Sequence, residues 1–139
     1  MTARTLAGGC LCGQVRYRAE GPALFQSLCH CRDCQRASGS GGMPVMGLAR
    51  SGFHVDGAVA VYVSTGGSGQ PTRRNFCPVC GSTLFGLPDM APDLVTLYAG
   101  SLDDPTGFVP AREIFVRDRP AWAASAVPCE AFFTLPEAG

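Results

Sequence analysis

The chain consists of short stretches in which apolar and polar residues alternate, and helical periodicity is almost absent. Alternation with a period of two places successive side chains on opposite faces, which is typical of β-strands. Glycine, proline and aspartate interrupt these stretches, as in AEGP, VDG and LPDMAPD, and such residues favour tight turns. The pattern predicts strands at Gln14–Ala19, Ala23–Cys29, Met43–Leu48, Val59–Ser64, Ser82–Leu87, Leu94–Ala99 and Glu113–Val116.

Two further segments, Arg32–Ser38 and Ala121–Ser125, have patterns that allow a single helical turn each. The stretch STGGSGQP (64–71) is the most flexible-looking part of the chain, but it is too short to separate two domains. A length of 139 residues is also that of one ordinary domain with one core. We therefore expect residues 1–139 to form a single, mainly β domain of short antiparallel strands.

The charged residues exclude some classes of function. Eleven basic residues, all arginine, balance eleven acidic ones, so no net field attracts nucleic acid or anionic lipid. No apolar run approaches the ~20 residues of a membrane span, and MTARTLAGGCLCG at the N-terminus lacks the apolar centre of a secretory signal. We expect a cytoplasmic protein that binds neither nucleic acid nor membranes.

The eight cysteines are the most informative residues, and their spacing sorts them into groups. The groups are Cys10 and Cys12; Cys29, Cys31 and Cys34; Cys77 and Cys80; and a lone Cys129. A disulfide framework would imply secretion, which the N-terminus does not support, and closely spaced bridges are strained. Burial as a small apolar residue suits Cys129, but it does not explain seven cysteines at ligand spacings. Metal binding explains them best.

Two of the pairs form the arms of a closed four-thiolate site. FCPVCG (76–81) has the form of a zinc knuckle, in which two thiolates lie on a tight turn, and GCLCG (9–13) is similar. Together, Cys10, Cys12, Cys77 and Cys80 make a tetrahedral structural site that joins the start of the domain to its middle. Zinc is the favoured metal because nothing else in the chain indicates electron transfer, although four thiolates also hold iron.

The cluster in LCHCRDCQRASGSG (28–41) has only three thiols, those of Cys29, Cys31 and Cys34. His30 lies inside it, but in an extended segment its cysteine neighbours project to the opposite side. His54 has the setting of an ordinary half-exposed strand residue, and Cys129 is the remaining candidate for a fourth ligand, without a second ligand beside it. We favour an open fourth position, because three protein ligands with a vacancy are typical of catalytic zinc.

Six segments, in order and over nearly the whole chain, resemble the glutathione-dependent formaldehyde-activating enzyme family. They are GGCLCGQVRY (8–17), CHCRDCQRASGSG (29–41), GFHVDG (52–57), RRNFCPVCGSTLF (73–85), YAGSLDD (98–104) and residues 120–122. The resemblance implies a β-tent fold built around a structural zinc, and two zinc ions per chain. It implies that Cys10, Cys12, Cys77 and Cys80 hold the structural zinc, and that Cys29, Cys31 and Cys34 hold a catalytic zinc that accepts the glutathione sulfur. This is the same partition that the spacing predicts.

The resemblance further implies a carbon–sulfur lyase that adds a thiol such as glutathione to formaldehyde or another aldehyde. A free thiol has a pKa of about 8.5, and metal binding deprotonates it. Arg32, Arg36, Arg73 and Arg74 flank the metal motifs, where they either anchor substrate carboxylates or form ordinary solvated surface. Arg36, Ser38 and Arg74 are the candidate substrate contacts, with Ser38 also interpretable as a turn residue.

A second interpretation is a non-enzymic zinc-binding interaction module with two structural metal sites. It predicts the same cysteine clusters, but no binding of a small-molecule thiol at the three-cysteine cluster. The neutral charge and the lack of a stripe of basic and aromatic residues argue against nucleic acid as the partner of such a module.

Overall fold

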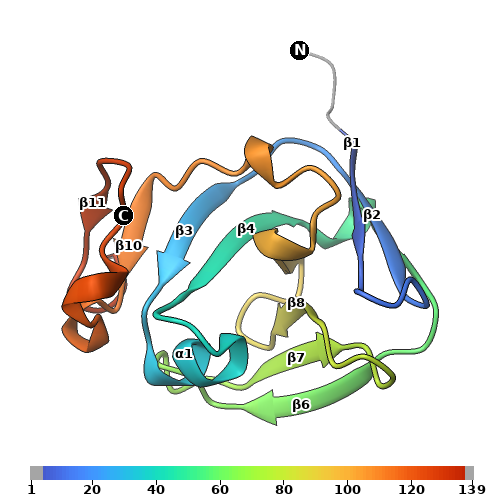
Figure 1. Ribbon diagram of the computed structural model, residues 1–139, viewed down its shortest axis with the longest axis horizontal. Coiled ribbons are helices and arrows are strands. Elements are labelled where there is room, and N and C mark those ends of the chain that lie inside the picture. The colour runs from blue at the N-terminus through green and yellow to red at the C-terminus, as the bar shows by residue number, and fades with distance from the viewer. Residues whose placement is uncertain (1–4, 137–139) are drawn as a thin grey trace.

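The computed structural model describes residues 5–136, which form two β-sheets (Figure 1). The smaller sheet contains β1 (Thr5–Gly9), β2 (Arg16–Glu20) and β5 (Phe53–Asp56), with β2 in the middle. The strands of the larger sheet are β3 (Phe25–Cys29), β4 (Met43–Ala49), β6 (Ala60–Ser64), β7 (Thr72–Phe76), β8 (Thr83–Pro88), β9 (Leu94–Tyr98), β10 (Arg112–Ile114) and β11 (Glu130–Ala131). Their order is β11-β10-β3-β4-β9-β8-β7-β6. The expected mainly β fold is confirmed.

Most neighbouring strands are antiparallel, as expected, but β10 is an exception. It pairs in parallel with β3 on one side and with β11 on the other. The chain reaches β10 from the far end of β9 through a long connection, and this places β10 and β11 at the edge of the larger sheet (Figure 1). The sheet is therefore mixed rather than purely antiparallel.

All seven predicted strands are present with shifted ends, and four strands were not among them: β1, β5, β7 and β11. In β1 the sequence TLAGG gives little strand signal, because two glycines weaken the pattern. A Cβ at Gly8 would lie 2.4 Å from the Tyr17 hydroxyl oxygen, so the close approach of β2 requires glycine there. In β7 the apolar alternation is broken because Arg74 and Asn75 are buried.

The helix α1 (Arg32–Ser38) has the predicted bounds, and its ends have local causes. At its start, the Cys31 sulfur accepts a hydrogen bond from the Cys34 backbone N–H at 3.4 Å, as an N-cap residue does. At its end, Gly39 adopts a left-handed conformation with φ of 67°. The other helical segments are single 3₁₀ turns at Arg50–Gly52, Ala99–Ser101, Pro105–Gly107, Val116–Asp118 and Ala121–Ala123. Within residues 5–136, no helix has the length and apolarity to cross a membrane.

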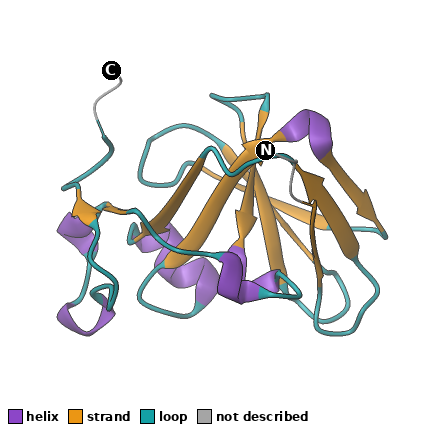
Figure 2. Ribbon diagram, turned by 90° about the horizontal axis from the view of Figure 1, so that it is seen from above, coloured by secondary structure: helices purple, strands orange, loops and turns teal. Residues whose placement is uncertain are grey.

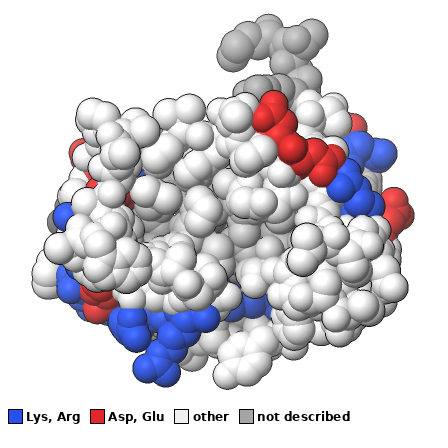
Figure 3. Space-filling model, in the orientation of Figure 1, with Lys and Arg blue, Asp and Glu red and all other residues white. Residues whose placement is uncertain are grey.

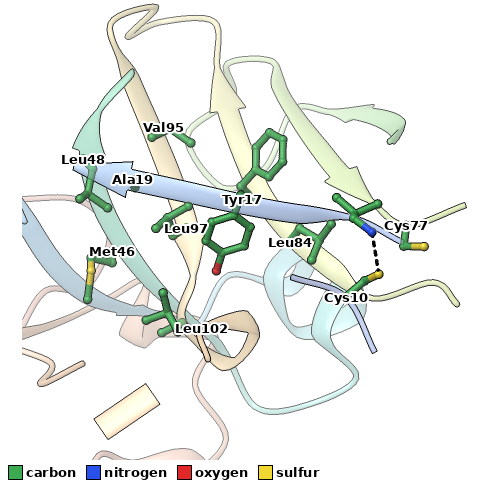
Figure 4. Close-up of a cluster of buried hydrophobic side chains, with 13 residues drawn as sticks. Cys10, Tyr17, Ala19, Met46, Leu48, Cys77, Leu84, Val95, Leu97 and Leu102 are labelled. Atoms are coloured by element: carbon green, nitrogen blue, oxygen red, sulfur yellow. Dashed lines mark hydrogen bonds between the residues drawn. The ribbon is translucent and has the colours of Figure 1, made fainter. Parts of the chain in front are cut away.

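The main core lies between the two sheets (Figure 4). The buried side chains that Figure 4 labels are Tyr17 and Ala19 of β2, Met46 and Leu48 of β4, Leu84 of β8, Val95 and Leu97 of β9, and Leu102, with Cys10 and Cys77 at one end. Burying each large aliphatic side chain stabilises the fold by about 1.5–3 kcal/mol. Because side chains alternate along a strand, the residues that lie between the core residues in β4, β8 and β9 point to the second face of the larger sheet.

Candidate functional site

The four-cysteine cluster joins the turn between β1 and β2 to the turn between β7 and β8. Its thiols are those of Cys10, Cys12, Cys77 and Cys80, and the four sulfur atoms all lie within 4.8 Å of one another. The sulfur of Cys12 is 3.5 Å from that of Cys10 and 3.7 Å from that of Cys77. A tetrahedral site with metal–sulfur bonds of about 2.3 Å has sulfur–sulfur edges of about 3.8 Å. The cluster thus has the dimensions of a site for one ion.

Backbone N–H groups point at the sulfur atoms of this cluster. The Val15 N–H donates to the Cys10 sulfur at 3.2 Å (Figure 4), and the Val79 N–H donates to Cys77 at 3.4 Å. Hydrogen bonds from the hydroxyl and the backbone N–H of Ser82 lower the pKa of Cys80 to about 5. Each of these contacts favours the thiolate form that a metal ion binds.

The three-cysteine cluster lies where β3 meets α1. Cys29 ends β3, Cys31 caps α1 and Cys34 lies in its first turn; all three are buried, and their sulfur atoms lie within 4.8 Å of one another. In the described part of the chain, no further histidine, cysteine or carboxylate joins this group. Cys129 lies apart, with its sulfur 3.3 Å from the carbonyl oxygens of Pro110 and Val127. Among the described residues, this cluster therefore offers three ligands, and an open fourth position stays a prediction.

His30 points away from the cluster and fixes the backbone between Cys29 and Cys31. Its Nδ1 donates to the Gly41 carbonyl at 2.8 Å, and its Nε2 lies 2.9 Å from a carboxylate oxygen of Glu113. Glu113 also accepts from Arg119 at 2.9 Å. Although burial alone would raise the pKa of Glu113, the hydrogen bonds from His30, the Ser125 N–H and Arg119 lower it. The ionised carboxylate therefore holds His30 in place, and so orients the two neighbouring thiols.

The cysteines of this cluster have strongly different tendencies to ionise. The pKa of Cys31 is lowered, because its sulfur accepts hydrogen bonds from the thiols of Cys29 and Cys34 and from the Cys34 N–H. The pKa of Cys29 is raised by its thiol neighbours and by burial. Cys31 at the start of α1 is thus the first of the three to become a thiolate.

A buried arginine reaches the cluster from β7. The side chain of Arg74 is 8% exposed; its Nη2 lies 3.6 Å from the Cys34 sulfur, and its Nη1 donates to the Tyr98 hydroxyl at 3.4 Å. Burial raises the pKa of Tyr98 to about 12, so its hydroxyl keeps its proton at neutral pH. A fixed positive charge therefore lies beside the thiols, with a protonated phenol next to it.

A cavity of about 300 Å³ opens on the three-cysteine cluster. Its floor is the second face of the larger sheet. One row of residues crosses four neighbouring strands there: Arg112 of β10, Ser27 of β3, Val45 of β4 and Tyr98 of β9. Phe115, which adopts the left-handed conformation with φ of 55°, lines the cavity from the segment after β10. Such backbone strain in a residue other than glycine is found most often at functional sites.

The remaining predicted residues lie outside this cavity. Arg36 is exposed on α1, and the Ser38 hydroxyl donates to the Cys34 and Gly42 carbonyls at 2.7 and 3.1 Å. Their roles as substrate contacts stay predictions, whereas Arg74 lines the cavity. Sequence reasoning missed Tyr98 and Arg112 as cavity residues, because their position depends on strand register rather than on a local motif.

Charge is distributed unevenly over the surface (Figure 3). On the face shown there, basic side chains gather near α1, acidic and basic ones mix near β1 and β2, and much of the area between is uncharged. This face thus has no continuous basic stripe of the kind that binds nucleic acid.

Comparison with known proteins places this geometry in a family. The sequence model of the glutathione-dependent formaldehyde-activating enzymes matches residues 5–118. The chain belongs to this family. A protein of Halomonas elongata, whose name assigns it provisionally to the same activity, is 29% identical over 123 residues, which are 84% of this chain and 78% of that protein.

A solved structure supports the fold. The crystal structure of a Rhodobacter sphaeroides protein has a TM-score of 0.58 and 23% identity, and the match covers 75% of this chain and 97% of that one. The region that matches the glutathione-dependent formaldehyde-activating enzymes contains all seven clustered cysteines. Cys129 and the cavity residue Leu135 lie beyond it.

Proposed function

We propose that this family member is a zinc-dependent carbon–sulfur lyase, which adds a thiol such as glutathione reversibly to formaldehyde or another aldehyde. The observation that carries the proposal is the contrast between a four-thiol cluster and a three-thiol cluster that lines a cavity. We assign two zinc ions per chain, one to each cluster. Zinc, when bound at the open cluster, would supply the Lewis acidity that turns a substrate thiol into a thiolate at neutral pH.

Arg74 compensates the charge of the open cluster. Three thiolates around a divalent cation leave one negative charge, and a substrate thiolate adds another. The buried guanidinium beside Cys34 offsets part of this charge at a distance of 3.6 Å. A charged partner in a site with little water acts more strongly than it would at the surface. Arg74 therefore stabilises the thiolate form of both the protein ligands and the substrate.

Tyr98 is the proton donor of the proposed reaction. As the substrate sulfur forms a bond to the aldehyde carbon, the π electron pair of the carbonyl moves to the oxygen, and this oxygen takes up a proton. The reaction gains and loses no proton overall, because the thiol gave up one when it became a thiolate. The Tyr98 oxygen already accepts a hydrogen bond from Arg74, so its own O–H would be left to donate to the carbonyl oxygen of a bound aldehyde. In the reverse direction the phenolate recovers this proton.

Two glycines keep the space that these groups need. A Cβ at Gly86 would lie 2.7 Å from the Tyr98 hydroxyl oxygen, and a Cβ at Gly67 would lie 2.9 Å from the Cβ of Cys31. The loop that contains Gly67 is fixed by a hydrogen bond of 3.0 Å from the Gly66 N–H to Asp33. This loop covers the three-cysteine cluster and limits the access of water to it.

Metal analysis combined with thiol titration tests the proposal. The purified protein should contain two zinc ions, be colourless and bind glutathione or another small thiol. The Cys34→Ser variant should keep one zinc ion and lose thiol binding. If that variant holds two zinc ions and binds the same thiol equally well, the assignment of the open site is wrong. Two zinc ions without any thiol binding would support the non-enzymic module instead.

The site also agrees with a reducing compartment. All eight cysteines are free thiols, and the seven in the two clusters need that state to bind metal. We therefore propose that the protein works in the cytoplasm.

A further inference from the structure

The cavity wall has a composition that limits what the substrate can be. Most of its side chains are apolar, and the charged groups that line it in residues 5–136 are two arginines, without any aspartate or glutamate. Its apolar lining includes Phe25, Val45, Leu94, Ile114, Phe115 and Leu135. A ligand that fits this wall has an apolar body and a negative charge. An ammonium group would find no counter-ion among the described lining residues.

Two hydroxyl groups on the floor of the cavity already have hydrogen-bond partners. The Thr96 hydroxyl donates to the Gly86 carbonyl at 3.1 Å, and the Ser27 hydroxyl accepts from Arg112 Nε at 2.6 Å. Peptide groups of a ligand would therefore lose water and find few free partners on this floor, which costs free energy. Glutathione carries two such groups and an ammonium.

Arg112 is the free anion-binding group in this wall. Its guanidinium carbon lies 4.8 Å from the centre of the Phe25 ring, which holds the side chain along the floor of the cavity. Within residues 5–136, its hydrogen bond to Ser27 comes from Nε, and no described residue accepts from its two Nη groups. These donors form the planar fork that binds a carboxylate at two points. Arg74, by contrast, is occupied by Ser64, Tyr98 and Cys34.

Strand register gives the distance between the Arg112 guanidinium and the three-cysteine cluster. Arg112 pairs with Ser27, two residues before Cys29 in β3, and its guanidinium reaches toward Phe25, four residues before Cys29. At about 3.3 Å per residue, the anion therefore lies roughly 7–13 Å from the level of the three-cysteine cluster. An extended chain advances by about 1.2 Å per bond, so about six to eleven bonds join sulfur and carboxylate over this range.

We propose that the cavity selects a thiol in which an apolar chain of about six to eleven bonds separates the sulfur from a carboxylate, and that Arg112 binds this carboxylate. The inference rests on the proposed function, because the three-cysteine cluster fixes the position of the sulfur. It makes Arg112 the residue that determines specificity and ranks glutathione below an aliphatic thiol acid.

Isothermal titration of the zinc-loaded protein with three probes tests this inference. The probes are 6-mercaptohexanoate, its uncharged counterpart 6-mercaptohexan-1-ol, and glutathione. We expect 6-mercaptohexanoate to bind about 10- to 100-fold more tightly than the alcohol, because only the acid makes the charged contact. It should also bind at least about tenfold more tightly than glutathione.

A variant identifies the residue that reads the charge. Arg112→Gln should lose about 10- to 100-fold in affinity for 6-mercaptohexanoate and leave the affinity for the alcohol nearly unchanged. Arg50→Gln, which removes an exposed arginine outside this cavity, is the matched control and should change neither affinity.

The outcomes separate the two proposals. Equal affinities for the acid and the alcohol in the unmodified protein, or tighter binding of glutathione than of the acid, would overturn the selectivity proposed here while leaving the lyase proposal intact. An unmodified protein that binds none of the three thiols would overturn both proposals. The comparison of probes needs no variant, so it holds even if Arg112→Gln does not fold.

Discussion

The two cysteine clusters use the same side chain in opposite surroundings. The four-cysteine cluster closes on itself, and Cys10 and Cys77 are part of the main core between the sheets. The three-cysteine cluster lies on the second face of the larger sheet, beside a cavity and a buried arginine. Under the proposed function, ligand number and environment together distinguish the site that stabilises the fold from the site that reacts.

Removal of one thiol from the closed cluster should have the largest effect. Cys77→Ser should unfold the protein or lower its melting temperature severely, as measured by circular dichroism. A structural zinc site contributes an apparent binding free energy of about 10–16 kcal/mol, which matches or exceeds the about 5–15 kcal/mol by which a domain is stable. Cys34→Ser is the matched change in the open cluster and should still melt cooperatively. Equal destabilisation by both changes would remove the distinction between the clusters.

The next largest effect should come from Tyr98→Phe, which tests whether the open cluster is reactive. Loss of a positioned proton donor typically lowers a rate by about 10²- to 10⁴-fold. Nuclear magnetic resonance exchange between free aldehyde and thiol adduct measures this rate, and thiol affinity should change little. Tyr17→Phe is the control, because Tyr17 is also buried and donates or accepts a hydrogen bond of 2.7 Å with Ser101. A normal rate in Tyr98→Phe would exclude Tyr98 as the donor.

Arg74→Met should have a smaller effect, on binding rather than on stability. Loss of a charged contact worth about 1.5–3 kcal/mol should weaken thiol binding by about 10- to 150-fold. Arg73→Met changes the neighbouring residue, which is half exposed and pairs with Asp89 at 3.1 Å, and should leave binding unchanged. Titration calorimetry of both variants decides the point. Similar losses in both would mean that general charge, rather than the contact with Cys34, supports the site.

The smallest effect should come from Cys129→Ser. Because the Cys129 sulfur contacts carbonyl oxygens and the Ser125 hydroxyl rather than the clusters, zinc content and thiol affinity should stay as in the unmodified protein. Mass spectrometry under native conditions counts the zinc ions. A protein that loses one ion on this change would have a closed second cluster after all.

The cysteine groups and the helix could be predicted because their causes are local. Spacing alone separates four cysteines from three, and the structure brings together the same sets. The bounds of α1 follow from the capping by Cys31 and Gly39, two residues of the motif itself. The strand β2 could be predicted for a local reason too, because Tyr17 and Ala19 form one buried face.

The cavity could not be predicted because it depends on contacts between distant strands. β7 carries Arg74 and Asn75 inward and so lacks the apolar alternation that identifies a strand. Tyr98 reaches the cavity because of its register with Val45, and Arg112 because β10 runs parallel to β3. Local patterns carry no information on either pairing.

The residues that line the cavity come from two parts of the chain, one inside the family match and one beyond it. Leu135 lines the cavity from a segment beyond residue 118, where the match to the family ends. The C-terminal part of the chain lies at one side of the molecule (Figure 2). The N–H groups of Phe115 and Val116 bind this segment through the carbonyls of Thr134 and Phe132. The seven clustered cysteines and Arg74 all lie before that point. Under the proposed function, mutations in the C-terminal segment would therefore change the cavity wall while the clustered cysteines and Arg74 stay unchanged.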